Sequence, residues 1–158
     1  MFAQLDTKSV YSFMDSVVDL NSYVARAKEL GYQALGLMDR DNLYAAYHFA
    51  QLASRNGLRP LIGMEANLFY EGRKIPFRLL AKNNQGYKNL MKLATELSSG
   101  QREFTAFSDY LNAIALILPS EDWEPGMTLG SEVFIGVRPE DVGKEFDYPV
   151  VPLHTVRY

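Results

Sequence analysis

The sequence contains no cysteine and only two histidines, His48 and His154, among its 158 residues. The absence of cysteine excludes disulfide bonds, thiolate zinc sites and a cysteine nucleophile. It also fits a reducing compartment, and we expect a cytoplasmic protein. Two histidines are too few for the imidazole clusters of hydrolytic zinc or manganese centres.

The sequence also lacks an excess of basic residues, a signal peptide and any long apolar run. Its formal net charge is −3, whereas surfaces that bind phosphate are usually basic. The opening MFAQLDTKSV does not have the basic and then apolar layout of a secretory signal, and no apolar run approaches membrane-spanning length. Because 47% of the residues are hydrophobic, one domain over residues 1–158 can bury a core.

Apolar runs of strand length alternate with segments of helical periodicity. The expected helices are one capped by Asp15 or Asp19 and ended by Gly31, one from Asp41 or Asn42 to Asn56, and one over roughly 84–98. The expected strands are 2–7, 32–38, 58–70, 74–82, 113–118, 132–137 and 148–153, with a turn at Glu71-Gly72 and at most a short helix over 139–146. The alternation predicts an α/β fold with a largely parallel sheet, open or closed as a barrel.

Polar side chains recur where these expected strands end. In parallel α/β folds, functional groups gather at the carboxyl ends of the strands. The candidates are Asp6, Lys8, Asp39, Arg40, Glu65 and the segment from His154 to Arg157. Charged residues are also ordinary in exposed loops, and for any single candidate that simpler interpretation is the stronger one.

A metal site is the first specific hypothesis for these strand ends. Their carboxylates could hold Mg²⁺, but the cations expected in the same place would repel it. His48 lies inside an expected helix, where a core or surface histidine is more common than a ligand. His154 stands at a strand end, but one histidine does not build a cluster. Taken by themselves, the residues argue against a metal centre.

Other kinds of site find little support. The sequence has no G-x-S-x-G motif and no glycine-rich phosphate loop. A stacking platform for single-stranded nucleic acid is conceivable from Tyr44, Tyr47, Phe69 and Tyr70. Their spacing is that of core residues, so we expect them to pack inside.

Five segments follow patterns of one known family. The first segment, residues 2–16, reads FAQLDTKSVYSFMDS and is similar to the family pattern F-x-H-L-H-x-H-S-x-Y-S-L-x-D-G. The second, residues 27–50, reads AKELGYQALGLMDRDNLYAAYHFA and is similar to A-K-x-L-G-x-x-A-L-A-L-T-D-H-G-N-L-x-G-A-x-x-F. Residues 59–68 read RPLIGMEANL and are similar to K-P-I-I-G-x-E, and residues 81–95 read AKNNQGYKNLMKLAT and are similar to A-K-N-x-x-G-Y-x-N-L-x-K-L. The last segment, residues 150–158, reads VVPLHTVRY and is similar to V-A-T-N-D-V-H-Y. The chain thus resembles the PHP (polymerase and histidinol phosphatase) domain of the bacterial replicative DNA polymerase III alpha subunit.

The resemblance implies a distorted TIM-like (β/α)7 barrel with metal-ligand positions at its strand ends. In this sequence those positions hold Asp6, Lys8, Asp39, Arg40, Glu65, Thr155 and Arg157. Asp39 and Glu65 are the acids that the family keeps, whereas the other five are substituted and three of those are cations. The family's trinuclear metal site cannot form from this set. The pattern resembles the degenerate PHP domains of DnaE-type polymerases from low-GC Gram-positive bacteria.

The resemblance also implies a function. The parent protein is expected to be a DNA-directed DNA polymerase of replication, a nucleotidyltransferase whose catalytic aspartates and Mg²⁺ belong to downstream domains. The chain itself is expected to be a non-catalytic structural and interaction module, with no catalytic residue and no cofactor. Its implied partners are the palm and thumb domains of the same polypeptide, and in the family a proofreading exonuclease can dock on this domain.

Two alternatives stay open. The chain could be a metal-dependent phosphoesterase or 3′–5′ exonuclease, which would require an intact PHP site. It could also be a nucleic-acid-binding module in which the strand-end cations cradle a phosphate. The net charge of −3 argues against the latter, and we expect weak or no DNA binding by the chain alone and no membrane association.

The substituted positions predict a replacement for the metal. Three acids, Asp6, Asp39 and Glu65, would face three bases, Lys8, Arg40 and Arg157. We expect a partly buried network of ion pairs in which each carboxylate keeps a positive partner.

Overall fold

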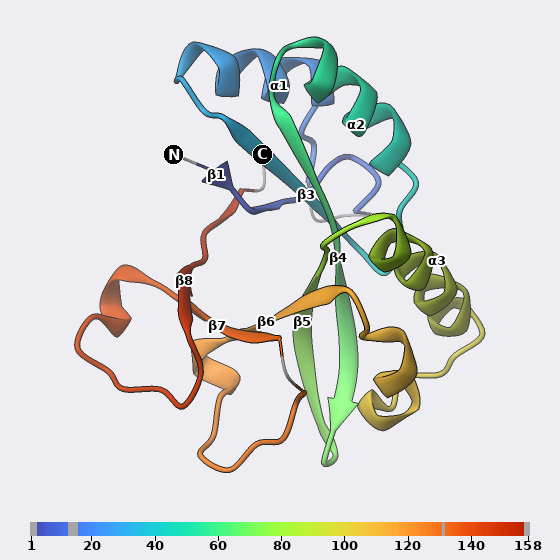
Figure 1. Ribbon diagram of the computed structural model, residues 1–158, viewed down its shortest axis with the longest axis vertical. Coiled ribbons are helices and arrows are strands. Elements are labelled where there is room, and N and C mark those ends of the chain that lie inside the picture. The colour runs from blue at the N-terminus through green and yellow to red at the C-terminus, as the bar shows by residue number, and fades with distance from the viewer. Residues whose placement is uncertain (1–2, 13–15, 131, 157–158) are drawn as a thin grey trace.

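The computed structural model describes residues 3–12, 16–130 and 132–156, and its strands form a strongly curled sheet (Figure 1). The strands are β1 Ala3–Gln4, β2 Asp6–Thr7, β3 Ala34–Arg40, β4 Arg59–Tyr70, β5 Arg73–Ala81, β6 Ile114–Pro119, β7 Val133–Val137, β8 Val150–Pro152 and β9 Thr155–Val156. The α-helices are α1 Leu20–Glu29, α2 Ala46–Arg55 and α3 Asn84–Ser98, and the short 3₁₀ helices are η1 Phe104–Tyr110, η2 Ser120–Asp122 and η3 Pro139–Asp141.

Seven strands form one sheet in the order β1-β3-β4-β5-β6-β7-β8. Neighbouring strands run parallel except at β4–β5 and β5–β6, which are antiparallel. A separate parallel pair, β2 with β9, joins the first part of the chain to the last and completes a ring at one end of the sheet. The expected α/β fold with a distorted, barrel-like sheet is confirmed.

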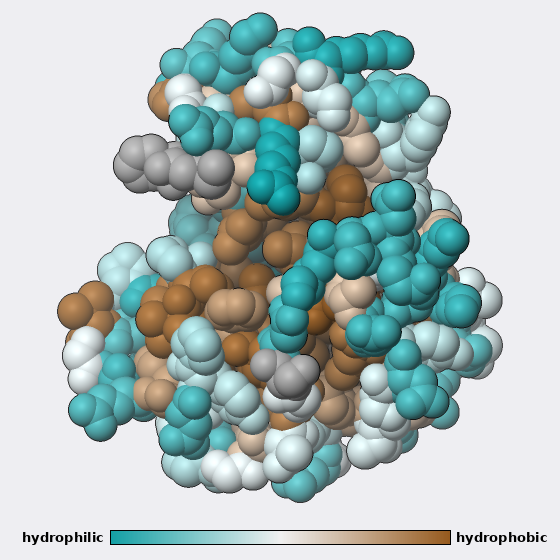
Figure 2. All heavy atoms as spheres, viewed as in Figure 1, coloured by the Kyte–Doolittle hydropathy of each residue, from teal (hydrophilic) through white to brown (hydrophobic). Residues whose placement is uncertain are grey.

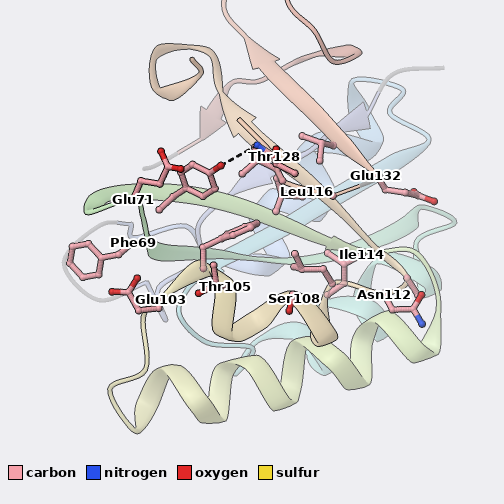
Figure 3. Close-up of a pocket in the computed structure, with 17 residues that line it drawn as sticks. Phe69, Glu71, Glu103, Thr105, Ser108, Asn112, Ile114, Leu116, Thr128 and Glu132 are labelled. Carbon is pink, nitrogen blue, oxygen red and sulfur yellow. Dashed lines mark hydrogen bonds between the residues drawn. The ribbon is translucent and has the colours of Figure 1, made fainter. Parts of the chain in front are cut away.

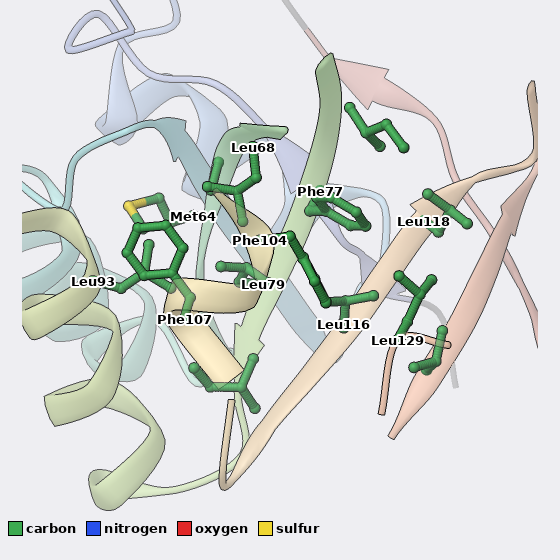
Figure 4. Packing of buried hydrophobic residues seen from close by; sticks show 14 of the residues in the cluster. Met64, Leu68, Phe77, Leu79, Leu93, Phe104, Phe107, Leu116, Leu118 and Leu129 are labelled. Carbon is green, nitrogen blue, oxygen red and sulfur yellow. The ribbon is translucent and has the colours of Figure 1, made fainter. Parts of the chain in front are cut away.

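The elements form an inner cluster and two outer layers. The inner cluster contains Met38, Ile117 and Leu153 and lies inside the ring of strands. On the face shown in Figure 2, hydrophobic residues gather in the middle, where Figure 1 shows the inside of this ring. Outside the ring, α1 and α2 cover one part of the sheet. The larger core lies where α3 and η1 pack on β4, β5 and β6, around Phe77 and Phe107 (Figure 4).

Local chemistry explains several element ends. Asp19 caps α1 by accepting a hydrogen bond from the amide of Ser22, and Asn83 caps α3 in the same way. Glu71 and Gly72 both have positive φ angles, 49° and 78°, as a two-residue hairpin turn with the twist of its strands requires. The expected caps at Asp19 and the turn at Glu71-Gly72 are confirmed, whereas Asp15 lies outside the described residues.

The second helix begins four or five residues later than the sequence predicts. Asp41 has a φ of 55°, which is incompatible with a helix, and α2 begins at Ala46. The Asp41 carboxylate accepts a hydrogen bond from Nη1 of Arg102 at 2.7 Å, so a contact distant in sequence holds this residue in the loop. None of the helices in the described ranges is long and apolar enough to cross a membrane.

The expected packing of the aromatic residues is wrong in part. Tyr44 and Tyr47 are 79% and 71% exposed, and Phe69 is 37% exposed. On α2 the buried positions are Ala46, Phe49 and Ala53. Ala46, Phe49 and Ala53 are spaced by three and four residues and so share one face of the helix, and Tyr47 lies outside that face.

Candidate functional site: a buried ion-pair network

Strand pairing brings four of the candidate positions to one end of the sheet. Arg40 at the end of β3 pairs in register with Glu65 on β4. Asp6 on β2 pairs with Thr155 on β9. Side chains alternate between the two faces of a strand, so Arg40 lies on the same face as Met38 of the inner cluster. The candidate side chains therefore cap the inner apolar cluster at this end of the ring.

A close backbone approach seats β2 against β3. A Cβ atom on Gly36 would lie 2.1 Å from the carbonyl oxygen of Leu5, so only glycine fits at this point of β3. Beside it, the Tyr23 hydroxyl accepts a hydrogen bond from Thr7 at 2.6 Å and donates one to the carbonyl of Gly36 at 3.0 Å. These contacts fix the short strand that carries Asp6 and leads to Lys8.

Lys8 is the centre of the site. Its ammonium lies 2.5 Å from Oδ1 of Asp6 and 3.1 Å from Oε2 of Glu65. The Lys8 and Asp6 side chains are 0% exposed and the Glu65 side chain is 2% exposed. A single positive charge thus bridges two buried carboxylates from different strands.

Arg78 on β5 supplies a second buried cation that the sequence analysis did not identify. Its Nε lies 3.0 Å from Oδ2 of Asp6, and its Nη2 lies 3.4 Å from Oε2 of Glu65. The hairpin register could have revealed it, because Tyr70 pairs with Arg73 beside the turn and five residues further along each strand Glu65 pairs with Arg78.

Two further side chains complete the network. Arg40 donates from Nε to Oε1 of Glu65 at 3.0 Å, and its side chain is 40% exposed. The Thr155 hydroxyl donates to Oδ2 of Asp6 at 2.5 Å. Oε2 of Glu65 lies within ion-pair distance of both buried cations but accepts no hydrogen bond of good geometry, so charge rather than a directed bond holds it.

Among the described residues, Asp39 takes part in no ion pair and is held by hydrogen bonds instead. Its Oδ1 accepts hydrogen bonds from the amide of Ser9 at 2.6 Å and the hydroxyl of Ser12 at 2.7 Å. Its Oδ2 accepts one from the Ser9 hydroxyl at 2.6 Å. The expectation that each acid has a cationic partner is therefore confirmed for Asp6 and Glu65, whereas Lys8 and Arg40, the two described cations of the expected set, pair with these acids and not with Asp39. Arg157, the third cation expected here, lies outside the described residues.

The charges of the network set the pKa values of its acids. Burial by itself would raise the pKa of Asp6 and of Glu65, because it disfavours the charged form. The positive charges of Lys8 and Arg78, together with side-chain hydrogen bonds, outweigh burial and hold both pKa values below the ordinary 3.8 and 4.5. Both carboxylates are therefore ionised at neutral pH.

These shifts predict how stability depends on pH. Because the folded pKa values lie below the unfolded ones, ionised Asp6 and Glu65 contribute stability above the unfolded values and lose it as pH falls through the folded ones. We expect the free energy of unfolding, measured by urea denaturation, to fall as pH is lowered below about 4. The variant Asp6→Asn should show a shallower fall. Equal slopes for the two proteins would contradict this assignment.

The site does not fit a metal ion. Lys8 occupies the space between Asp6 and Glu65, where a cation shared by the two carboxylates would have to sit. His48 and His154 are both exposed, and His48 lies on α2. Within residues 3–12, 16–130 and 132–156, no group of three or more His, Cys, Asp or Glu side chains is placed to hold a metal.

Comparison with known proteins identifies the family. Residues 4–124 match the family described as the PHP domain. The chain belongs to the PHP domain family. It is 45% identical over 160 residues to the DNA polymerase III subunit alpha of Streptococcus pyogenes serotype M1, and 33% identical over 126 residues to that of Bacillus subtilis. The alignments cover 100% and 76% of this chain but only 15% and 11% of the relatives.

A solved structure supports the fold of this PHP domain. An amidohydrolase from Chromobacterium violaceum aligns with a TM-score of 0.55 and 10% sequence identity, over 78% of this chain and 69% of that one. At that identity the likeness concerns the fold alone. The expected resemblance to the PHP domain of DNA polymerase III alpha subunits is confirmed by the sequence matches.

Proposed function

We propose that this PHP domain is part of a DNA polymerase III alpha subunit and serves there as a non-catalytic structural and interaction module. The observation that carries the proposal is the position of Lys8, which is fully buried between Asp6 and Glu65. Both carboxylates stand at metal-ligand positions of the family, and both already have buried cations as partners. Lys8 and Arg78 hold the strand ends together in the way that metal ions would.

The polymerase itself is the proposed context. The relatives are named DNA polymerase III subunit alpha, and this chain spans about 15% of their length. DNA-directed DNA synthesis, with its Mg²⁺, would belong to the rest of such a polypeptide. The proposed partners are its palm and thumb domains, with a proofreading exonuclease as a further candidate.

A working phosphoesterase or 3′–5′ exonuclease is the alternative, and metal content separates the two proposals. We expect elemental analysis of the purified chain to find no stoichiometric zinc, manganese or iron, because two buried cations already neutralise the ligand carboxylates. EDTA should leave the melting temperature unchanged, and added Mn²⁺ should produce no hydrolysis of p-nitrophenyl phosphate or primed DNA. One equivalent of metal retained through dialysis, together with a lower melting temperature in EDTA, would favour the enzyme.

A further inference from the structure

An apolar groove of about 480 Å³ lies beside α1, on the outside of the ring of strands (Figure 1). One of its walls is α1, which contributes side chains from Ser22 to Leu30, and another is Leu35 of β3. Val156 of β9 also lines the groove. Because β9 pairs with β2, the groove lies over the junction where the last described strand meets the first ones.

Apolar side chains of this groove are in contact with water. Val17 is 78% exposed and Leu30 is 57% exposed, and Val156 is partly exposed. The larger cavity over β6 and η1 is different (Figure 3), because Ile114 and Leu116 in its lining are each only 2% exposed. Of the two, the groove beside α1 therefore offers apolar surface that a docking segment could remove from water.

The first two helices of the ring follow one packing rule. The helix α1 follows β2, and its Tyr23 contacts both Thr7 of β2 and Gly36 of β3. The helix α2 follows β3 and contacts β3 and β4. Each helix thus covers the strand before it and the next strand around the ring, as right-handed crossovers in a barrel require. By the same rule, a helix that follows β9 would lie over β9 and its parallel partner β2, which is the position of the groove.

The polypeptide after β9 is well placed to supply this helix. Within the described ranges, α1 is the only helix that lines the groove. The chain spans 15% of the length of its Streptococcus pyogenes relative, so in the proposed polymerase the polypeptide continues beyond β9. Because β9 ends at Val156, which itself lines the groove, a short loop is enough to bring a following helix onto it.

We propose that this groove is the docking site of an amphipathic helix that follows β9 in the same polypeptide. Apolar side chains on one face of that helix would cover Val17, Leu30 and Val156, and its polar face would be turned to solvent. The inference rests on the proposed function, because that function places the chain in a longer polypeptide.

Cysteine labelling tests the proposal directly, because these 158 residues contain no cysteine. The variant Leu30→Cys places a thiol in the groove. The matched control is Met91→Cys, at a 42% exposed apolar position of α3 outside the groove. Each variant is made in the 158-residue chain and in the full-length polypeptide. Iodoacetamide alkylates accessible thiols, and mass spectrometry of the peptide that carries each position measures the rate.

We expect the thiol of Leu30→Cys to react at least about tenfold more slowly in the full-length polypeptide than in the 158-residue chain. The slowing for Met91→Cys should be clearly smaller. A photoactivatable cross-linker attached to the new thiol of full-length Leu30→Cys should mark residues within about 30 positions after β9, the span of a loop and one helix. Circular dichroism would verify that both variants are folded.

Three results would each overturn the proposal. They are equal labelling rates for Leu30→Cys in the two polypeptides, equal slowing for Leu30→Cys and Met91→Cys, and cross-links that map to a more distant part of the polypeptide. The last result would mean that another domain covers the groove. None of these outcomes bears on metal content or hydrolysis, and retained metal would contradict the non-catalytic role without affecting the docked helix, so the two proposals fail separately.

Discussion

Replacing Lys8 by methionine should lower the free energy of unfolding by about 3–5 kcal/mol. The side chain is fully buried and its ammonium contacts both Asp6 and Glu65. Methionine has a similar length and fills irregular space well, so loss of packing should be a minor part of the change. The main part is the loss of a cation from two buried carboxylates. Most small domains have a total stability of about 5–15 kcal/mol, so the effect is large.

Urea denaturation at neutral pH measures this change, and a pH series tests its cause. Without Lys8, less positive charge opposes the effect of burial on the two acids, so the pKa values of Asp6 and Glu65 should rise. At acidic pH the two carboxylates of the folded variant would take up protons, which removes the unfavourable buried charge, whereas the unaltered protein loses stability there. The difference between the two proteins should therefore shrink as pH falls below about 5. A loss that does not depend on pH would indicate a packing defect instead.

Two further variants serve as controls. Arg26→Met removes an exposed cation whose partner is Glu29 on the same helix, and it should change stability by about 0.5 kcal/mol or less. Adding Asp6→Asn to Lys8→Met should recover part of the loss, because it removes one of the uncompensated charges. A loss below about 1 kcal/mol for Lys8→Met would mean that the network does not depend on this cation.

Replacing Asp39 by alanine should lower the free energy of unfolding by about 3 kcal/mol. Three donors lose their acceptor, namely the amide and hydroxyl of Ser9 and the hydroxyl of Ser12. Ser9 and Ser12 are 0% and 1% exposed, so water cannot easily replace the carboxylate. Each buried polar group left without a partner costs about 1–3 kcal/mol, and relaxation of the serine loop should offset part of the sum.

A double-mutant cycle separates this mechanism from an ion pair. If Asp39 were paired with Arg40, the change Arg40→Ala would recover part of the loss caused by Asp39→Ala. In the structure the side chain of Arg40 pairs with Glu65, so we expect the double variant to be no more stable than Asp39→Ala. Thermal or urea denaturation of the two single variants and the double variant decides the point. Clear recovery in the double variant would contradict the hydrogen-bonded arrangement of Asp39.

The sequence alone determined the local elements and the family. Asp19 and the spacing of apolar residues specify α1, and the pair Glu71-Gly72 specifies the hairpin of β4 and β5. Such signals could be recognised because caps, turns and periodicity act over a few residues. Five motifs of the sequence indicate the PHP domain, and Lys8 and Arg40 at metal-ligand positions predict ion pairs in place of metal.

Only the tertiary structure decided which charged side chains form pairs. Arg78 reaches Asp6 from 72 residues away, and the Thr155 hydroxyl reaches it from 149 residues away. These contacts exist only because β5 lies beside β4 in one register and β9 closes the ring against β2. Asp39 and Arg40 are adjacent in sequence, but side chains alternate along a strand, so one faces the buried serines and the other faces Glu65. The order of the strands and the pairing of β2 with β9, which no local pattern encodes, therefore assigned the distant partners.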